Sequence, residues 1–84
     1  MVTVTPNLRC IVDHDGAVIL DISRDSMTTL NSTGGYVWGK LQQGKAVDEV
    51  VRELSFESNT DPVEVARDVH AFVEQLMAKH LLRD

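Results

Sequence analysis

The sequence predicts an α+β fold of the winged-helix-like type, in which a three-stranded antiparallel sheet is followed by three helices (βββααα). Two features of the apolar pattern favour this class. Up to about residue 30 the apolar residues alternate with a period of two between short turns, and from residue 31 they recur every three or four positions. The chain has 84 residues and shows no linker, repeat or low-complexity segment, so residues 1–84 are expected to form a single domain.

Three strands are expected in the first thirty residues. The first covers Leu8 to Val12, and the turn that follows it, residues 13–16, ends in a glycine that accepts a positive φ. The second covers Ala17 to Ile22, where apolar positions alternate. After a break at residues 23–25, the third covers Ser26 to Leu30. Tight turns between consecutive strands predict an antiparallel meander.

The first helix is expected to begin within the stretch LNSTGGYVW, Leu30 to Trp38. Asn31 or Ser32 offers a side-chain oxygen that can cap a helix, and the two glycines let the helix start close to neighbouring backbone. The helix is expected to end at Gln43-Gly44, with glycine just beyond its last turn.

Two further helices follow. The second is expected from about Val47 to Glu57, with one apolar and one charged side. The third has the clearest start in the chain, because Asp61 is followed by a proline and, at the third helical position, by Glu64, which resembles a capping box. It is expected to run to about Lys79.

Composition narrows the class of partner and the compartment. The net charge is −5 and no basic run occurs, which disfavours a nucleic-acid partner. A lone cysteine, Cys10, excludes an internal disulfide and a cysteine-based zinc site, as is typical of a reducing cytoplasm. The longest apolar run, AVIL, is far shorter than a membrane span, and the N-terminus has no signal-like segment. We therefore expect a cytoplasmic protein without a membrane partner.

A catalytic site is not expected. Ser32 stands in a helix-cap context without a nucleophile elbow, and Gly34-Gly35 lacks both the dinucleotide-binding spacing and a phosphate-loop lysine. His70 and Glu74 have a metal-compatible spacing, but no second His or Cys completes a zinc site. The sequence therefore predicts no enzyme activity, no catalytic residues, no metal and no cofactor.

Two expected surfaces could bind a peptide. The third strand, Ser26 to Leu30, is short and carries neither charge nor proline, so its edge could accept an added strand. The last helix has a wide apolar stripe, and beside that edge it would form a groove with apolar pockets. In the alternative, the stripe is core and the N-terminus covers the edge. An open edge could also pair with a second copy and give a homodimer.

The chain resembles the PqqD-like proteins from about Leu8 to Leu82. Several short motifs match in order, and their spacing carries the resemblance. They are Leu30-Asn31-Ser32-Thr33-Gly34, Trp38, Leu41, Gly44, Asp48-Glu49-Val50, Asp61-Pro62, Asp68-Val69, Phe72-Val73, Leu76 and Leu81-Leu82.

The resemblance implies a recognition element for the leader of a ribosomally made, post-translationally modified peptide (RiPP). Such domains are non-catalytic and bind the leader as a strand between the third strand and the third helix. Carried over by position, the peptide-binding residues are Met27, Thr28, Thr29 and Leu30 on the strand edge and Val65, Asp68, Val69 and Phe72 on the helix. Asp68 would accept a hydrogen bond or charge from the leader or fix the local backbone; the alternative is an ordinary exposed carboxylate. Trp38 and Leu76 are interpreted as core.

The resemblance also implies a partner enzyme. A stand-alone chain of this size looks most like the lasso-peptide type, which delivers its precursor to a leader peptidase or other processing enzyme. The near alternative is the pyrroloquinoline quinone type, which hands its peptide to a radical enzyme. Two alternatives belong to other functional classes. They are a winged-helix DNA-binding protein and a purely structural subunit. The DNA-binding alternative needs a basic third helix, whereas residues 61–79 are rich in carboxylates.

Two positions depart from the family pattern. Ala46 stands where a capping Thr or Ser is common, so the second helix is expected to start frayed. His80 stands where glycine often precedes the final leucines. We expect it to adopt the left-handed conformation with slight strain.

Overall fold

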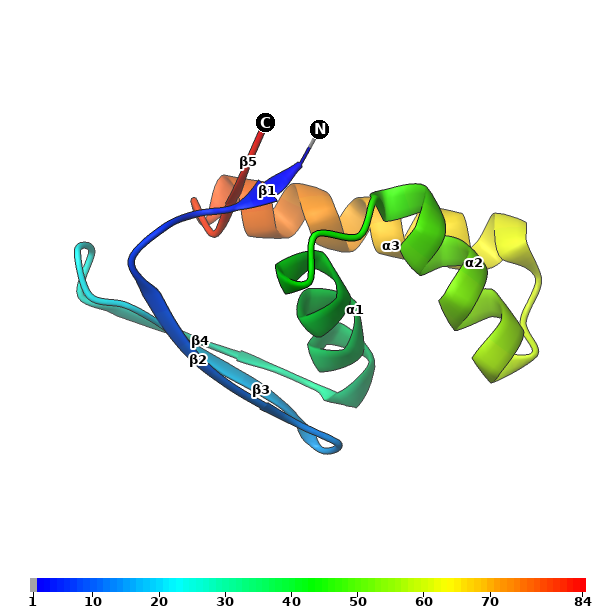
Figure 1. The fold of residues 1–84 in the computed structure, drawn as a ribbon, viewed down its shortest axis with the longest axis horizontal. Coiled ribbons are helices and arrows are strands. Elements are labelled where there is room, and N and C mark those ends of the chain that lie inside the picture. The colour runs from blue at the N-terminus through cyan, green and yellow to red at the C-terminus, as the bar shows by residue number, and fades with distance from the viewer. Residues whose placement is uncertain (1) are drawn as a thin grey trace.

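The computed structural model describes residues 2–84 and has the predicted order of three strands followed by three helices, with a small terminal sheet added (Figure 1). The main strands are β2 (Leu8–Asp13), β3 (Gly16–Asp21) and β4 (Ser26–Leu30). The helices are α1 (Ser32–Gln42), α2 (Val47–Ser58) and α3 (Pro62–Ala78). The terminal strands are β1 (Thr3–Val4) and β5 (Leu82–Arg83). None of these helices is long and apolar enough to cross a membrane.

The three-stranded sheet has the order β2-β3-β4 and is antiparallel throughout, as predicted. Ile19 at its centre pairs with Cys10 on one side and Thr28 on the other, so β2 and β4 are the two edges. Along β3, Ala17 and Ile19 are buried while Val18 between them is exposed. The pleat therefore gives the sheet one face toward the helices and one toward solvent.

The pairing of β1 with β5 was not expected from the sequence. Val4 pairs with Leu82, so the N-terminal segment crosses to the end of the chain instead of lying along β4. For residues 2–84, the alternative in which the N-terminus covers the β4 edge is therefore wrong. Each strand has two residues, which is too short for an alternating pattern to be recognised.

Two helices begin with the predicted side-chain caps. The Asn31 Oδ1 atom accepts a hydrogen bond from the backbone N–H of Gly34 at 2.8 Å. The Asp61 Oδ1 atom accepts one from the backbone N–H of Val63, also at 2.8 Å. Each cap satisfies a donor that the first helical turn leaves free. The N-cap Asn31 directly follows the last residue of β4, which places the start of α1 against the end of that strand.

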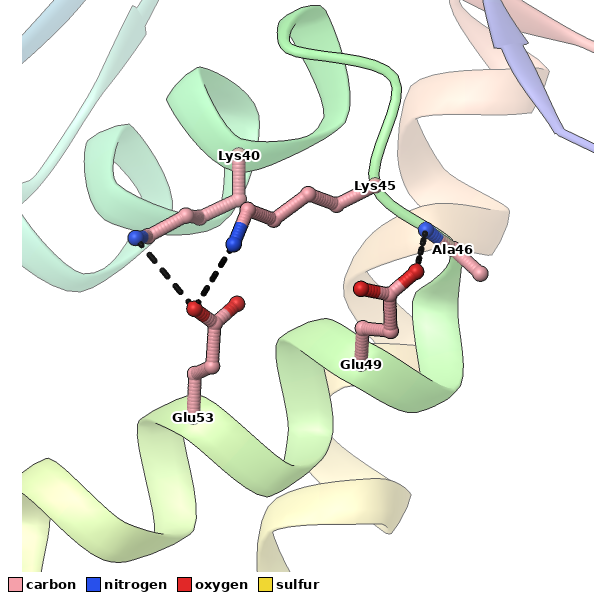
Figure 2. Close-up of polar contacts among 5 residues, drawn as sticks. All are labelled: Lys40, Lys45, Ala46, Glu49 and Glu53. Carbon is pink, nitrogen blue, oxygen red and sulfur yellow. Dashed lines mark hydrogen bonds and ion pairs between the residues drawn. The ribbon is translucent and has the colours of Figure 1, made fainter.

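The two departures from the family pattern are accommodated differently. Ala46 has no side chain that could accept a cap, yet the Glu49 carboxylate accepts from the Ala46 backbone N–H at 3.3 Å, and α2 begins at the predicted Val47 (Figure 2). Half of a capping box thus holds the start of α2. His80 has φ of 62°, the left-handed conformation expected of it.

The core forms where α1 packs between the sheet and the other helices. The Trp38 side chain of α1 is 0% exposed and Leu76 of α3 is 1% exposed, which confirms both as core residues. Ile19 contributes the sheet side of the same cluster. Figure 1 shows α1 between the sheet and α3, with α2 beside α3.

An ion-pair cluster ties α2 to α1 and to the loop between them. The Glu53 Oε1 atom lies 2.8 Å from Lys45 Nζ and 3.6 Å from Lys40 Nζ (Figure 2). The hydrogen bond from Lys45 lowers the pKa of Glu53, and the same bond raises the pKa of Lys45. The Lys40 ammonium also lies 5.2 Å from the centroid of the Tyr36 ring. Burial raises the pKa of this tyrosine to about 12, so it stays neutral at physiological pH.

We expect Glu53→Gln to destabilise the fold at neutral pH but not in acid. Because the pKa of Glu53 is lowered in the folded state, its ionised form contributes stability above the ordinary glutamate pKa of 4.5, and this contribution is lost as the pH falls below it. The pairs are partly exposed to solvent, so a small decrease of the melting temperature is expected at pH 7. Thermal unfolding at pH 7 and pH 3 measures this, with Glu74→Gln as a control on α3. An equal loss at both pH values would contradict the ion-pair account.

Candidate functional site

A groove of about 520 Å³ opens where the end of β4, the start of α1, the end of α2 and one side of α3 from Val65 to Gln75 meet. It contains six of the eight residues predicted as peptide-binding, which are Thr29, Leu30, Val65, Asp68, Val69 and Phe72. The fold therefore brings the predicted strand and helix positions to one place. We call this hollow the groove.

The other two predicted residues lie outside the groove, on the same edge strand. Met27 points to the solvent face of the sheet, where its side chain is 67% exposed. Thr28 points to the helix-facing side and is half-buried opposite Ile19. They remain next to the edge of β4, so an added strand would run past them before it reached the groove.

The apolar part of the groove has a buried floor and accessible walls. Val65 and Val69 are almost fully buried and belong to the core, so they form the floor. Phe72 on α3 and Leu30 at the end of β4 are half-buried and pack against the core from its rim. These two side chains therefore offer most of the apolar surface that an incoming side chain can bury.

Asp68 is the only ionisable residue that lines the groove. Its side chain is exposed and forms no ion pair or side-chain hydrogen bond within residues 2–84. A free carboxylate beside an apolar floor can accept a hydrogen bond or pair with a cation on a ligand. In the part of the chain that the structure describes, no three His, Cys, Asp or Glu side chains gather closely enough to hold a metal ion.

Several lining residues were missed from the sequence because they come from other elements. The start of α1 contributes Asn31, Thr33 and Gly34, and the end of α2 contributes Leu54 and Ser58. For the α1 residues, the helix cap at Asn31 was the feature of the sequence that could have indicated them, because it places the first turn of α1 directly beside Leu30. Nothing in the pattern of α2 indicated that its end would reach the same groove.

Gly34 sets the position of the Phe72 ring. A Cβ atom at residue 34 would lie 3.2 Å from Phe72 Cζ and 3.3 Å from Leu30 Cβ, which is closer than most side-chain contacts. Because the ring is the far end of a side chain, it could move by a few tenths of an ångström. The missing side chain at Gly34 therefore lets Phe72 and Leu30 approach each other across the start of α1.

Gly35 fixes the start of α1 against the β2–β3 hairpin. A Cβ atom there would lie 2.8 Å from the backbone carbonyl carbon of Gly16, and backbone cannot move aside cheaply. Gly16 has φ of 146°, and a Cβ atom at that position would lie 2.1 Å from the carbonyl oxygen of Leu30. The two glycines thus allow a backbone contact beside the groove, which accounts for the small residues in LNSTGGYVW.

The edge of β4 next to the groove is open. β4 pairs with β3 on one side only, and no strand within residues 2–84 pairs with the other side. Its outward backbone N–H and C=O groups are therefore available to an extended chain. An edge strand that leads into an apolar groove matches the arrangement used for peptide recognition by strand addition.

The fold and groove define a winged-helix-like domain with an open strand edge beside an apolar groove. The sequence family described as coenzyme PQQ synthesis protein D (PqqD) matches residues 16–82. The chain therefore belongs to the PqqD family, which confirms the resemblance found in the sequence. No curated protein sequence matches the chain significantly.

Two solved structures are similar over nearly the whole chain. TbiB1 in complex with the TbiA(beta) leader peptide is 26% identical and has a TM-score of 0.91, with 96% of this chain and 94% of that chain covered. Lasso peptide synthetase B1 complexed with the leader peptide is 22% identical and has a TM-score of 0.87, with 99% and 98% covered. Because the lasso peptide synthetase B1 structure is only 22% identical, its similarity is evidence for a shared fold and not for a shared function.

Three glycine-to-alanine changes in α1 separate the roles of these positions. Gly35→Ala is expected to lower the free energy of unfolding by about 1–3 kcal/mol, because the new methyl group meets backbone. Gly39→Ala is the matched control, since its Cβ would lie 3.7 Å from the nearest atom, Val12 Cγ1, and it should gain about 0.5–1 kcal/mol from helix propensity. Gly34→Ala should keep the fold and shift the NMR signals of the Phe72 ring.

Urea unfolding of the three variants measures these free energies. Equal stability of Gly35→Ala and Gly39→Ala would contradict the close contact between Gly35 and Gly16. An unchanged Phe72 ring spectrum in Gly34→Ala would contradict the role given to Gly34 in shaping the groove.

Proposed function

We propose that this protein binds the leader segment of a ribosomally made precursor peptide and presents it to a processing enzyme. The leader adds to the open edge of β4 as an extra strand, and its alternate side chains enter the groove beside α3. The observation that carries this proposal is the meeting of an unpaired strand edge with an apolar groove that contains one free carboxylate. All eight residues predicted from the sequence have a part in this arrangement, with Met27 and Thr28 acting through the strand edge alone.

The energetics of such binding divide between backbone and side chains. Backbone hydrogen bonds to β4 supply affinity that depends little on the leader sequence, and pockets for alternate side chains supply specificity. A disordered leader loses conformational entropy on binding, so a few buried anchors must dominate the affinity. Phe72 and Leu30 are the side chains best placed to receive an apolar anchor, and Asp68 is placed to receive a donor or cation.

The comparisons support a leader as the ligand. TbiB1, 26% identical to this chain, is described in complex with the TbiA(beta) leader peptide, and the more distant lasso peptide synthetase B1 is likewise complexed with a leader peptide. Lasso-peptide biosynthesis, with a leader peptidase as the downstream enzyme, is therefore the pathway class we favour. The alternative is the pyrroloquinoline quinone pathway, after which the matching family is named.

The role we assign is binding without catalysis. Asp68 is the single ionisable residue of the groove, and a nucleophile with its base, or an acid–base pair, would require at least two groups within hydrogen-bonding reach. The protein would instead raise the effective concentration of the precursor at the enzyme that acts on it. The chemistry of processing then belongs to that enzyme.

Titration with synthetic leader peptides, encoded beside the gene, tests the proposal. We expect saturable binding, and Phe72→Ala should weaken it by about tenfold or more, because a central aromatic anchor is lost. Phe56→Ala is the matched control, since Phe56 on α2 is 88% exposed and lies outside the groove. Calorimetry measures the affinities, and urea unfolding confirms that each variant is folded.

The contribution of Asp68 has its own test. Asp68→Asn keeps the size of the side chain and removes its charge, so it should weaken leader binding a few-fold and reduce the salt dependence of the affinity. Glu74→Gln on the same helix, outside the groove, is the control. Equal effects of the two changes would mean that Asp68 is an ordinary surface carboxylate. No binding by any neighbouring leader would overturn the proposed function itself.

A further inference from the structure

The three-stranded sheet has a second edge, formed by β2, which is also unpaired. β2 pairs with β3 on one side, and no strand within residues 2–84 pairs with its other side. No residue of β2 lines the groove, so this edge is separate from the proposed leader site. An unpaired edge strand exposes backbone N–H and C=O groups with which another chain can pair.

The charged residues of β2 are opposite in sign and symmetrical about the centre of the strand. Arg9 and Asp13 stand two positions on either side of Ile11, and all three side chains are exposed. Because side chains alternate along a strand, these three point to the same face of the sheet. In a second copy paired antiparallel about Ile11, Arg9 of each chain therefore lies opposite Asp13 of the other.

The register centred on Ile11 is specific. Opposite residues of an antiparallel pair point to the same face, so the register can shift only in steps of two residues. Such a shift would place Arg9 opposite Ile11, or opposite Asp15, which lies in the turn and not in the strand. The centred register alone pairs Arg9 with Asp13 while both remain within β2.

Both charged groups are available for this contact. The Arg9 side chain has no ion pair or side-chain hydrogen bond within residues 2–84. The Asp13 Oδ1 atom accepts a hydrogen bond from the Asp15 backbone N–H at 2.8 Å, which leaves the other oxygen for a cation. Charges on an edge strand usually keep other chains away. Symmetrical opposite charges instead favour a second copy, because each charge meets its counterion.

Two apolar side chains at this edge would be buried by the pairing. Ile11 is 73% exposed, and Val12 is 40% exposed although it lies on the side of the sheet that faces the helices. The α1 residue nearest to it is Gly39, where an added Cβ atom would lie 3.7 Å from Val12 Cγ1. The missing side chain leaves Val12 accessible to a second copy.

We propose that a second copy of this chain pairs with β2 in the antiparallel register centred on Ile11. The dimer has a continuous six-stranded sheet with the two β2 strands at its centre. With strands about 4.8 Å apart, the two β4 edges lie about 24 Å apart at the ends of this sheet. Both grooves stay open. The pairing needs no leader, so it is independent of the proposed function.

The edge of β4 is less suited to a second copy. Its five residues carry no charge, so self-pairing of β4 forms no ion pair in any register. Self-pairing there would also occupy the edge that leads into the groove. The two edges thus differ in their partners, with a second copy on β2 and an extended peptide on β4.

The dimer is expected to be weak, because its interface is small. Five paired residues span only about 17 Å along the strand. A stable interface buries about 800 Å² on each partner, which is more than one strand edge provides. We therefore expect a monomer–dimer equilibrium that shifts with protein concentration.

Sedimentation equilibrium over a range of concentrations measures this dimer. Arg9→Glu and Asp13→Lys each place like charges opposite one another, so each should raise the dissociation constant by about tenfold or more. Arg67→Glu is the control, because Arg67 is exposed on α3 and lies outside the groove, and the change of net charge equals that of Arg9→Glu. A wild type that stays monomeric up to about 1 mM would overturn the inference.

A mixture of the two charge variants tests the register. A chain with Arg9→Glu and a chain with Asp13→Lys have opposite charges at both contacts when they pair with each other. The mixture should therefore recover the affinity of the wild type, although neither variant dimerises well alone. Asp13→Lys also removes the hydrogen bond to Asp15, and recovery in the mixture separates the loss of charge pairing from a folding defect. No recovery, with both variants folded by thermal unfolding, would overturn the register.

A disulfide cross-link tests the two-fold axis directly. Ile11→Cys in a Cys10→Ser background places two thiols on the axis with Cβ atoms about 4.5–5.5 Å apart, near the separation that a disulfide needs. Mild oxidation should give a covalent dimer. Ile22→Cys in the same background is the control, because Ile22 is 62% exposed but lies beyond the end of β3. Equal cross-linking of both variants would indicate random collision and overturn the inference.

Added leader peptide separates the two edges. The β2 dimer keeps its dissociation constant when a leader saturates β4, whereas a dimer held through β4 would come apart. Dissociation by the leader would assign the second copy to β4 and overturn the inference. A wild type that dimerises through β2 but binds no leader would overturn the proposed function alone.

Discussion

The contact between α1 and the β2–β3 hairpin is the constraint on which the rest of the structure depends. It requires two glycines, since a Cβ atom at Gly35 would lie 2.8 Å from the backbone of Gly16. With the backbones this close, Trp38 and Ile19 become fully buried between helix and sheet. The same contact fixes the first turn of α1 beside the end of β4, which is where the groove begins. A local packing requirement thus determines where the groove lies.

The groove stays open because of what α3 packs against. Its backbone runs close to α2 and to the terminal strand β5, and the groove lies between α3 and the end of β4. The terminal strands tie the end of α3 to β1, because β5 contacts α3 and pairs with β1. An edge strand left unpaired is usually a liability for aggregation. In this fold β4 has only five residues and the start of α1 lies beside its end, which limits that liability.

Much of the fold could be predicted because the signals are local. Helix caps at Asn31 and Asp61, alternation in the strands and the period of the last helix depend on neighbours in the sequence. The β1–β5 pairing could not be predicted, since two-residue strands carry no pattern. The residues that line the groove were predicted in part. Met27 fell outside the groove and the end of α2 fell inside it, because both depend on how elements distant in sequence pack together.

Hydrogen exchange of the β4 backbone, followed by NMR as a leader peptide is added, tests the central claim most directly. If the leader adds as a strand, the amides of Ser26 to Leu30 that point away from β3 become protected at saturation. Amides on the free edge of β2 keep their exchange rates. A leader that binds to saturation without protecting those β4 amides, or that protects the edge of β2 instead, would contradict strand addition at this edge.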